Sequence, residues 1–263
     1  MIYALSTDIQ TPLGDLSSTL RAVRAHRSAL GTPITHLRGQ KLVTPIIGAL
    51  IQHEPHIDGY TLFESLCIQS AQRAIAKASI DVTSERCVFV LSSTKGDIWT
   101  PTATTAKRIA RALGNTTTPI VISLACTSGV AAQLVAYRLL ETGVYDTAVV
   151  IGADVLIEFV VSGFQCVHAV SESTCRPFDK NRDGLNLGEA VGTMVLSTHS
   201  DNPYAWRLLG GAIHNDANHI SGPSRTAEGA LRCINDCLSV CRHYQVEEDL
   251  ACVSSLETAT AYK

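Results

Sequence analysis

The sequence contains none of the short motifs that would assign a nucleotide or a catalytic metal. It has no Walker A loop and no HExxH motif, and Gly188 and Gly192 do not make a dinucleotide fingerprint. It has no CxxC pair either, although nine of its 263 residues are cysteines. Scattered cysteines in a chain of this length indicate reduced thiols in a cytoplasmic protein.

Long apolar runs and an excess of basic charge are also absent. No run of about 18 apolar residues occurs and no leader precedes a small-residue cleavage site, so we expect a soluble protein without a membrane span. The formal net charge of −3 excludes a generally basic, nucleic-acid-seeking surface. Charged residues make up 17% and apolar residues 46%, so most elements should be buried on more than one side.

Strand-like and helix-like segments alternate along the chain. The pattern predicts strands at 1–5, 87–92, 119–124, 147–152, 190–198, 204–213 and 251–255, and helices at 15–26, 62–78, 102–113, 130–142, 153–169 and 227–244. Residues 8–14 indicate a turn, and residues 31–60, with three prolines, an irregular surface segment. This alternation predicts an α/β fold with helix-covered sheets.

A cysteine lies at the junction between a predicted strand and a predicted helix. Residues 119–124 are rich in Ile and Val, and residues 130–142 have apolar side chains at spacings of three and four. Cys126 lies between them, where unpaired N–H groups point and the helix dipole is positive. That field favours the thiolate and makes the sulfur a usable nucleophile. A buried cysteine that packs beneath the helix is the alternative.

The segment 175–189 is the most distinctive stretch after this cysteine. Its acidic and amide side chains at 179–184 match the first half of an EF-hand calcium loop. The twelfth position of such a loop needs a bidentate carboxylate, and here it is Ala190. The residues that follow indicate a strand, whereas an EF-hand requires a helix. We therefore predict a charged loop that covers a site and is stabilised by internal ion pairs.

The loop 92–96 has two interpretations. Its backbone donors and Lys95 suit an anion, but a Lys-Gly pair in a loop is more often ordinary turn chemistry.

The cysteines and histidines of the C-terminal part also have two interpretations. Cys233, Cys237 and Cys241 lie four residues apart on one predicted helix, where apolar neighbours favour a packed stripe over a metal site. His214 and His219 have a spacing that suits ligands or acid–base groups, although polar loop histidines more often bond to backbone.

Several motifs occur in an order that resembles the β-ketoacyl-acyl-carrier-protein synthases, over nearly the whole chain. They are Ser93-Thr-Lys-Gly96, Ala125-Cys-Thr-Ser-Gly129, Val150-Ile-Gly-Ala-Asp154, Arg176-Pro-Phe-Asp179, Asp183-Gly-Leu-Asn-Leu-Gly-Glu189 and Asn215-Asp-Ala-Asn-His219. The resemblance implies a thiolase-like αβαβα layered fold. It also implies a homodimer, or a heterodimer with a related synthase, in which the strand before the nucleophile commonly pairs across the subunit interface.

The resemblance also implies a reaction, a decarboxylative Claisen condensation. Cys126 would take an acyl group from an acyl-carrier protein as a thioester, and malonyl-carrier protein would lose CO2 and attack that thioester. The amide of Cys126 would supply part of the oxyanion hole. No metal and no diffusible cofactor is expected, because the phosphopantetheine arrives on the carrier protein.

The sequence departs from the family pattern near its end. The family motif His-Gly-Thr-x-Thr, whose histidine stabilises the enolate, is matched here by Leu256-Glu-Thr-Ala-Thr260. Thr258 and Thr260, which in the family help hold the pantetheine arm, are present, but the histidine is not. His214 and His219 match neither of the two catalytic histidines of the family. We expect a C-terminally truncated chain, with a half that carries the nucleophile at 1–200 and an incomplete second half at 201–263.

Three functions remain open from the sequence. The first is a β-ketoacyl synthase of fatty-acid or polyketide biosynthesis, with an aryl-polyene pathway included. The second is a non-catalytic partner subunit akin to a chain-length factor, which the missing histidine favours and the retained cysteine disfavours. The third is a thiolase or a starter-unit acyltransferase that uses the cysteine without decarboxylation.

Overall fold

A mixed β-sheet forms the centre of the molecule. The computed structural model describes residues 1–215, 224, 226–246, 252 and 259. The sheet has the strand order β10 (Trp206–Leu208), β1 (Ile2–Thr11), β9 (Ala190–Ser197), β7 (Thr147–Asp154), β5 (Cys87–Ser92) and β6 (Ile120–Ile122), and the short β2 (Gly14–Asp15) pairs with the end of β1. Strands β6, β5 and β7 run parallel, while β9 is antiparallel to both β7 and β1.

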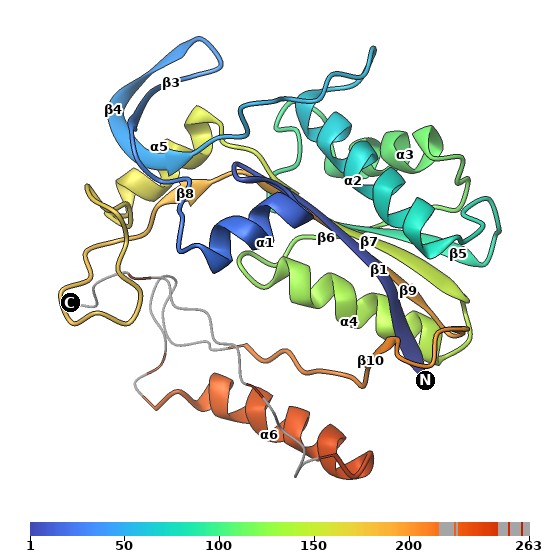
Figure 1. Ribbon diagram of the computed structural model, residues 1–263. Helices are drawn as coiled ribbons and strands as arrows, with labels where there is room; N and C mark the ends of the chain where they lie inside the picture. Colours follow the sequence, from blue (N-terminus) through green and yellow to red (C-terminus); the bar gives the residue numbers. More distant parts are fainter. Residues whose placement is uncertain (216–223, 225, 247–251, 253–258, 260–263) are drawn as a thin grey trace.

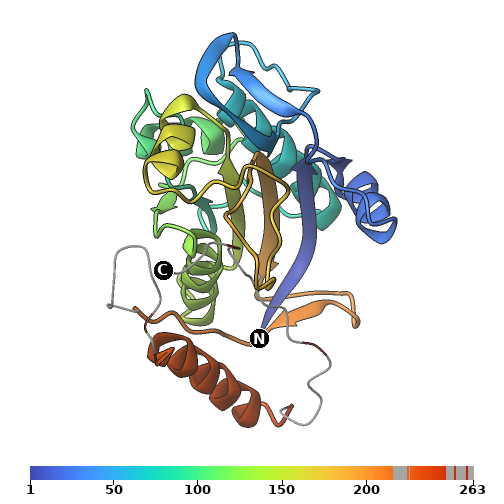
Figure 2. The same ribbon diagram turned by 90° about the vertical axis from the view of Figure 1, so that its left-hand side faces the viewer.

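Helices cover both faces of this sheet (Figures 1 and 2). Helices α2 (Leu62–Ala78) and α3 (Thr102–Ala112) pack on one face, against Phe89 and Ile151. Helix α4 (Ser128–Glu141) packs on the other face, against Val88 and Val150. Successive residues of β5 and β7 therefore enter opposite cores, which explains why both strands are apolar at nearly every position.

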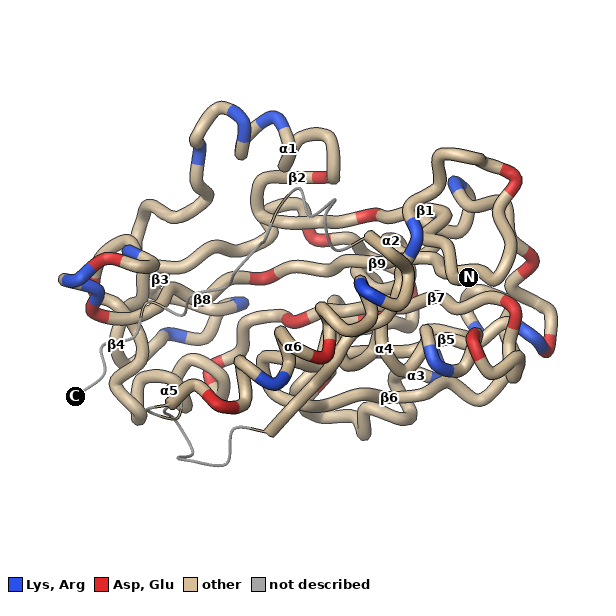
Figure 3. Tube along the Cα trace, turned by 90° about the horizontal axis from the view of Figure 1, so that it is seen from below, with Lys and Arg blue, Asp and Glu red and all other residues tan. Residues whose placement is uncertain are grey.

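The ends of the chain contribute two helices at the periphery. Helix α1 (Leu16–Arg24) begins at Asp15, whose carboxylate accepts a hydrogen bond from the backbone N–H of Ser18. Helix α6 (Glu228–His243) lies beyond α4, and the segment 210–211 passes between α4 and α6 (Figure 1). No helix in the described ranges is long and apolar enough to cross a membrane. Basic and acidic residues are interspersed along the trace, with a basic stretch at α1 (Figure 3).

Most of the predicted elements are confirmed. The helix at 62–78 and the strand at 87–92 have the predicted bounds, and the elements at 102–112, 128–141, 190–197 and 228–243 differ by one or two residues at an end. The predicted helix at 153–169 is shorter, because β7 continues to Asp154 and α5 spans Glu158–Cys166. The predicted strand at 251–255 lies outside the described residues.

Two predictions of irregular structure are wrong. Residues 8–11 belong to β1, where Asp8 is buried and paired with Arg73 (2.8 Å) and Lys77 (3.3 Å) of α2. The segment 31–60 contains the hairpin of β3 (Pro33–Leu37) and β4 (Gln40–Ala49).

The β3–β4 hairpin has a tight turn. The sequence did not predict it, because the prolines elsewhere in segment 31–60 suggest irregular structure. Arg38 (φ 46°) and Gly39 (φ 84°) form its two-residue loop, and such primed turns match the twist of the strands they join. Apolar side chains of the hairpin, among them Leu42 and Ile46, pack with Leu156 and Val161. The hairpin thus covers the start of α5.

The predicted division of the chain into two halves at residue 200 stays a prediction. Strand β10, which lies after that point, pairs with β1 at the beginning of the chain.

A buried carboxylate joins the hairpin to the sheet. Glu189 lies between β8 (Leu187–Gly188) and β9, and its side chain is 0% exposed. Its Oε1 accepts hydrogen bonds from Arg38 Nη2 (2.5 Å) and the N–H of Leu156 (2.9 Å), and its Oε2 accepts one from the N–H of Ile51 (3.1 Å). Four segments far apart in the sequence therefore meet at this one side chain.

The loop that precedes Glu189 is stabilised by its own polar groups. Asp183 accepts a hydrogen bond from Ser171 Oγ (2.9 Å) and pairs with Arg176 (3.5 Å). Asp179 accepts from the N–H of Asn181 (2.7 Å). These contacts are the internal pairing predicted for the loop. Within the described ranges no group of three or more acidic, histidine or cysteine side chains could hold a metal ion.

A glycine lets this loop approach a second backbone segment. Gly184 has φ +149°, and a Cβ at this position would lie 2.5 Å from the nitrogen of Ser171 and 2.7 Å from the carbonyl carbon of Val170. Its own N–H donates to the carbonyl of Ala259 (3.0 Å). Gly184 therefore holds the loop against Ala259.

We expect Glu189→Gln to lower the free energy of unfolding by about 3 kcal/mol, because the amide would place an N–H group among donors and leave Arg38 without its buried partner. Urea denaturation measures this change. The control is Glu54→Gln, which removes the other carboxylate that pairs with Arg38 (3.2 Å) but is 45% exposed. A surface pair contributes at most about 1 kcal/mol. Equal effects of the two substitutions would contradict the assignment.

We expect Gly184→Ala to destabilise the chain by about 2 kcal/mol, since the new methyl group would collide with fixed backbone atoms. Limited proteolysis within the loop 170–186 and urea denaturation both report this loss. The matched control is Gly163→Ala on α5, where no atom lies within 4 Å of the added Cβ. There the helical propensity of alanine should stabilise the chain by about 0.5–1 kcal/mol. A Gly184→Ala variant as stable as the Gly163→Ala variant would show that the close approach is unimportant.

Candidate active site

Three parallel strands end at the same edge of the sheet. Strands β5, β6 and β7 end at Ser92, Ile122 and Asp154. Crevices beyond the carboxyl ends of parallel strands are the usual binding sites of α/β folds. A cavity of about 510 Å³ lies at this edge, and its described lining residues are Ser92, Thr94, Lys95, Ala125, Cys126, Ser128, Gly129, Gly152, Ala153, Asp154, Val155, Leu156, Val160, Phe164, Gly188 and Ala190.

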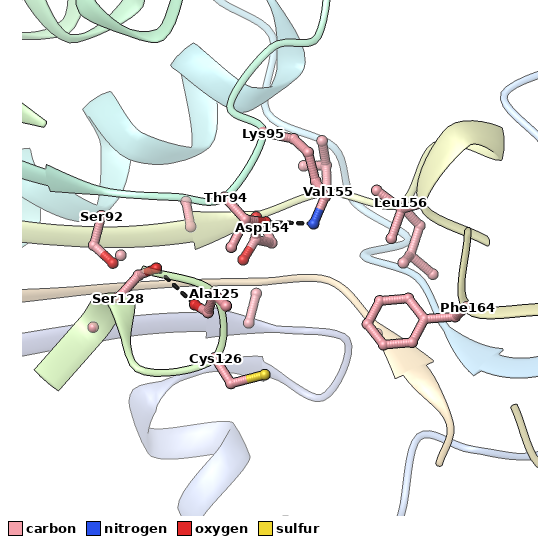
Figure 4. Close-up of a pocket in the computed structure, with 16 residues that line it drawn as sticks. Ser92, Thr94, Lys95, Ala125, Cys126, Ser128, Asp154, Val155, Leu156 and Phe164 are labelled. Atoms are coloured by element: carbon pink, nitrogen blue, oxygen red, sulfur yellow. Dashed lines mark hydrogen bonds between the residues drawn. The ribbon is translucent and has the colours of Figure 1, made fainter. Parts of the chain in front are cut away.

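Cys126 lies at the tip of a tight turn between β6 and α4. Ser128 closes the turn, because its Oγ donates to the carbonyl of Ala125 (2.6 Å) and accepts from the N–H of Leu124 (2.8 Å). Ala125 has φ 46°, a left-handed conformation that costs a residue with a side chain about 1–2 kcal/mol. Local strain of this kind is common where a side chain must be presented to a ligand. The turn leaves Cys126 exposed, with its sulfur at the cavity (Figure 4).

The start of α4 offers hydrogen-bond donors beside this cysteine. The N-cap residue, Thr127, makes no side-chain hydrogen bond to the helix, and the first turn of α4 contains no acidic residue. The first N–H groups of a helix lack partners within the helix and lie at its positive end. The structure thus confirms the predicted position of Cys126 at a strand-to-helix junction, and the alternative of a buried packing cysteine is wrong.

One wall of the cavity is polar. Ser93 Oγ donates to Asp154 Oδ1 (3.0 Å) and accepts from the N–H of Gly96 (2.9 Å), while Lys95 Nζ donates to Thr94 Oγ1 (2.7 Å). Asp154 reaches solvent through the cavity, yet the walls around its carboxyl group withdraw it from much of the water, and this burial raises its pKa. The hydrogen bond from Ser93 and the positive charge of Lys95 act in the opposite direction and lower the pKa of Asp154.

The other wall is apolar. It consists of Val155 and Leu156 after β7 and of Val160 and Phe164 on α5, and the ring of Phe164 faces the cavity (Figure 4). Leu156 is held in place by the bond from its N–H to Glu189. The cavity therefore combines a thiol, a cation, a carboxyl group and an apolar surface.

Several residues singled out from the sequence do not contribute to this cavity. Thr258, Thr260 and His219 lie outside the described residues. His214 Nε2 lies 2.7 Å from Asp236 Oδ2 of α6, so this histidine bonds to a helix and not to the residues around Cys126. The cysteines of α6 are half-buried. Within the described part of the chain they belong to no group of side chains that could hold a metal ion.

The sequence interpretation named Cys126 but missed Asp154 and Phe164 as parts of the same site. Asp154 lies in a recognised motif, and Phe164 lies in the helix predicted at 153–169. Asp154 ends β7, which β5 separates from β6, and Phe164 lies on α5 after β7, so only the strand order brings them to the same cavity as Cys126.

Comparisons with known proteins agree with this geometry. Residues 92–202 match the N-terminal domain of the β-ketoacyl synthases. The chain is 32% identical over 125 residues to 3-oxoacyl-[acyl-carrier-protein] synthase I, chloroplastic, of Hordeum vulgare, a match that covers 43% of this chain and 27% of the relative. It is 30% identical over 122 residues to 3-oxoacyl-[acyl-carrier-protein] synthase 2 of Staphylococcus aureus, with 42% and 30% covered. These matches thus span less than a third of the curated relatives' length.

Solved structures share the fold at low sequence identity. A ketosynthase from module 6 of the bacillaene synthase of Bacillus subtilis superposes with a TM-score of 0.82 at 18% identity, covering 98% of this chain and 51% of that one. A β-ketoacyl synthase from Burkholderia phymatum gives 0.77 at 20% identity, with 92% and 70% covered. A ketosynthase in complex with its chain length factor from Xenorhabdus doucetiae gives 0.72 at 20% identity, with 91% and 67% covered.

The fold, the position of the cysteine and the matched segment agree with one another. Residues 92–202 are therefore similar to the N-terminal domain of the β-ketoacyl synthases, and the chain has the thiolase-like α/β fold of the solved ketosynthases.

Proposed function

We propose that the chain is a β-ketoacyl-acyl-carrier-protein synthase-like condensing enzyme in which Cys126 accepts an acyl group. The observation that carries this proposal is the presentation of Cys126, on a strained turn at the N-terminus of α4, to a cavity of about 510 Å³. A thiol so placed is a nucleophile with hydrogen-bond donors beside it.

The first half-reaction suits the groups around the cysteine. The sulfur attacks the carbonyl carbon of a carrier-bound thioester, the carrier's phosphopantetheine thiol leaves, and the acyl group remains on Cys126. The oxyanion that forms during the attack lies near the N–H groups at the start of α4, and preorganised donors of this kind lower the barrier. The apolar wall of Leu156, Val160 and Phe164 suits the hydrocarbon part of an acyl group. The reaction needs no metal and no cofactor besides the carrier's own arm.

The second half-reaction places a further demand on the site. A malonyl group on the carrier loses CO2, its carbanion attacks the thioester carbon, and the Cys126 thiolate leaves. The enolate needs a hydrogen-bond donor, and the position that matches the first family histidine is Leu256. Loss of one such donor typically costs about 10²–10³ in rate. We therefore assign acyl transfer to Cys126 as the step best supported in this chain, and condensation as the step that needs a further donor.

A related subunit is the partner proposed beside the carrier protein. Strand β6 is at the edge of the sheet, and in the described residues it pairs only with β5. Leu124 and Val130, which follow it, are 48% and 54% exposed. An unpaired strand edge flanked by apolar side chains is a template for another chain. This supports a homodimer, or a heterodimer with a related synthase, through β6.

A chain-length-factor-like subunit is the second candidate. The leucine at position 256 favours it, and one of the similar solved structures is a ketosynthase in complex with its chain length factor. The retained Cys126 disfavours it, because a non-catalytic subunit has no need of an exposed thiol at a cavity.

We expect an acyl adduct on Cys126 when the chain is incubated with a panel of acyl-carrier proteins. Intact-mass spectrometry should show the mass of the acyl group on the wild-type protein and none on Cys126→Ala. The matched control is Cys166→Ala, which removes another exposed cysteine, on α5, and should leave the adduct in place.

Other outcomes of that experiment identify the alternatives. An adduct that persists in Cys126→Ala would contradict the proposed nucleophile. No adduct on a folded protein that co-purifies with a cysteine-containing synthase would favour the partner-subunit function. Acylation by coenzyme A thioesters without CO2 release from a malonyl donor would favour a starter-unit acyltransferase.

A further inference from the structure

The cavity beside Cys126 contains a cation that the proposed acyl transfer does not use. Lys95 and Asp154 are the charged residues among its described lining, and both come from the wall that faces Cys126 across the cavity (Figure 4). Lys95 and Cys126 follow strands β5 and β6, and Asp154 is the last residue of β7. Their meeting is therefore a product of the strand order and not of sequence proximity.

The ammonium group of Lys95 has unused hydrogen-bonding capacity. Its Nζ donates to Thr94 Oγ1 (2.7 Å), and within the part of the chain that the structure describes it forms no ion pair at 4.0 Å or less. An ammonium group carries three donors. Lys95 is close enough to lower the pKa of Asp154, but it is not in direct contact with that carboxylate. Two donors of a half-buried cation therefore remain for an anionic oxygen.

The loop that carries Lys95 is held rigidly. Ser93 is 2% exposed, and its hydroxyl group bonds both Asp154 and the N–H of Gly96. The N–H of Ser93 also donates to the carbonyl of Ile122 (3.3 Å), at the end of the strand that leads to Cys126. The cation is thus fixed relative to the nucleophile before any ligand arrives, which lowers the entropic cost of binding.

We propose that Lys95 makes this cavity selective for an acyl group that bears a carboxylate, and that its ammonium group pairs with that carboxylate beside Cys126. The identity of the group rests on the proposed function, whose donor is a malonyl thioester with one free carboxylate. Asp154 acts against the same ligand, because its negative charge repels an anion, and it limits the anion preference that Lys95 creates. No bond is made or broken in this recognition step, and no co-reactant is needed.

Alkylation of Cys126 tests this inference without any acyl transfer. Iodoacetate and iodoacetamide are of similar size and react at the same sulfur, but only iodoacetate carries a carboxylate. The ratio of their rates at Cys126, followed by peptide mass spectrometry, reports anion preference. Any change in the reactivity of the thiol itself cancels in this ratio. Cys166 of the same protein gives the reference ratio for an exposed cysteine away from Lys95.

We expect the iodoacetate-to-iodoacetamide ratio at Cys126 to fall about fivefold in Lys95→Gln, the order expected for one partly exposed ion pair. Lys95→Arg should retain most of the preference. Asp154→Asn, which keeps an oxygen for Ser93 and removes the charge, should raise the ratio. The matched control is Lys107→Gln, which removes an exposed positive charge on α3 and should leave the ratio unchanged.

An unchanged ratio in Lys95→Gln would overturn the inference. If that variant does not fold, the wild-type protein decides: the ratio at Cys126 should exceed that at Cys166 and should fall with added salt, because salt screens an ion pair. Equal, salt-insensitive ratios at the two cysteines would also overturn it. Failure of the proposed function can be told apart from failure of this inference. A protein that is not acylated by any carrier protein would still show the alkylation ratios expected here.

Discussion

The position of the apolar wall of the cavity depends on one buried carboxylate. Glu189 binds the N–H of Leu156, the N–H of Ile51 and the guanidinium group of Arg38, and its side chain is completely buried. Leu156 lies in the apolar wall of the cavity, and Arg38 lies in the turn of the hairpin that covers the start of α5. A buried charge is tolerated only when its hydrogen bonds are satisfied. The apolar wall at Leu156, the hairpin turn at Arg38 and the segment at Ile51 are therefore held together by this one side chain.

The sequence predicted the elements whose signals are local. The helix at 62–78 has an apolar face and a capping box between Thr61 and Glu64, and the strand at 87–92 is a short, wholly buried apolar run. Both were predictable because these signals lie within a few residues. Asp8 was misassigned to a turn because the two cations that neutralise it lie on α2, about 65 residues away. The β3–β4 hairpin was missed because its prolines suggested irregular structure, although Pro33 begins a strand and Pro45 lies beside a shift in register.

The candidate site was predictable only in its nucleophile. Cys126 follows a strand and precedes a helix in the sequence itself, so its presentation could be inferred from the order of residues. Lys95 and Asp154 are separated from it by 31 and 28 positions in the chain. They join it because β5 lies between β6 and β7 in the sheet, and strand order is not encoded in any local pattern. From the sequence alone, the Lys-Gly pair at 95–96 therefore favoured an ordinary turn over an anion site.

The exposure of Cys126 has different consequences for the two half-reactions proposed for it. Transfer of an acyl group between two thiols exchanges one thioester for another and proceeds at a solvent-accessible sulfur. A carbanion formed by loss of CO2 is protonated by water, so condensation requires a site from which water is excluded. Leu124 and Val130 remain exposed beside the cysteine, and a second protein surface on them would close the cavity on that side. The open cavity and the leucine at position 256 thus have the same consequence. Both leave acyl transfer possible, and both make condensation depend on groups beyond the described cavity.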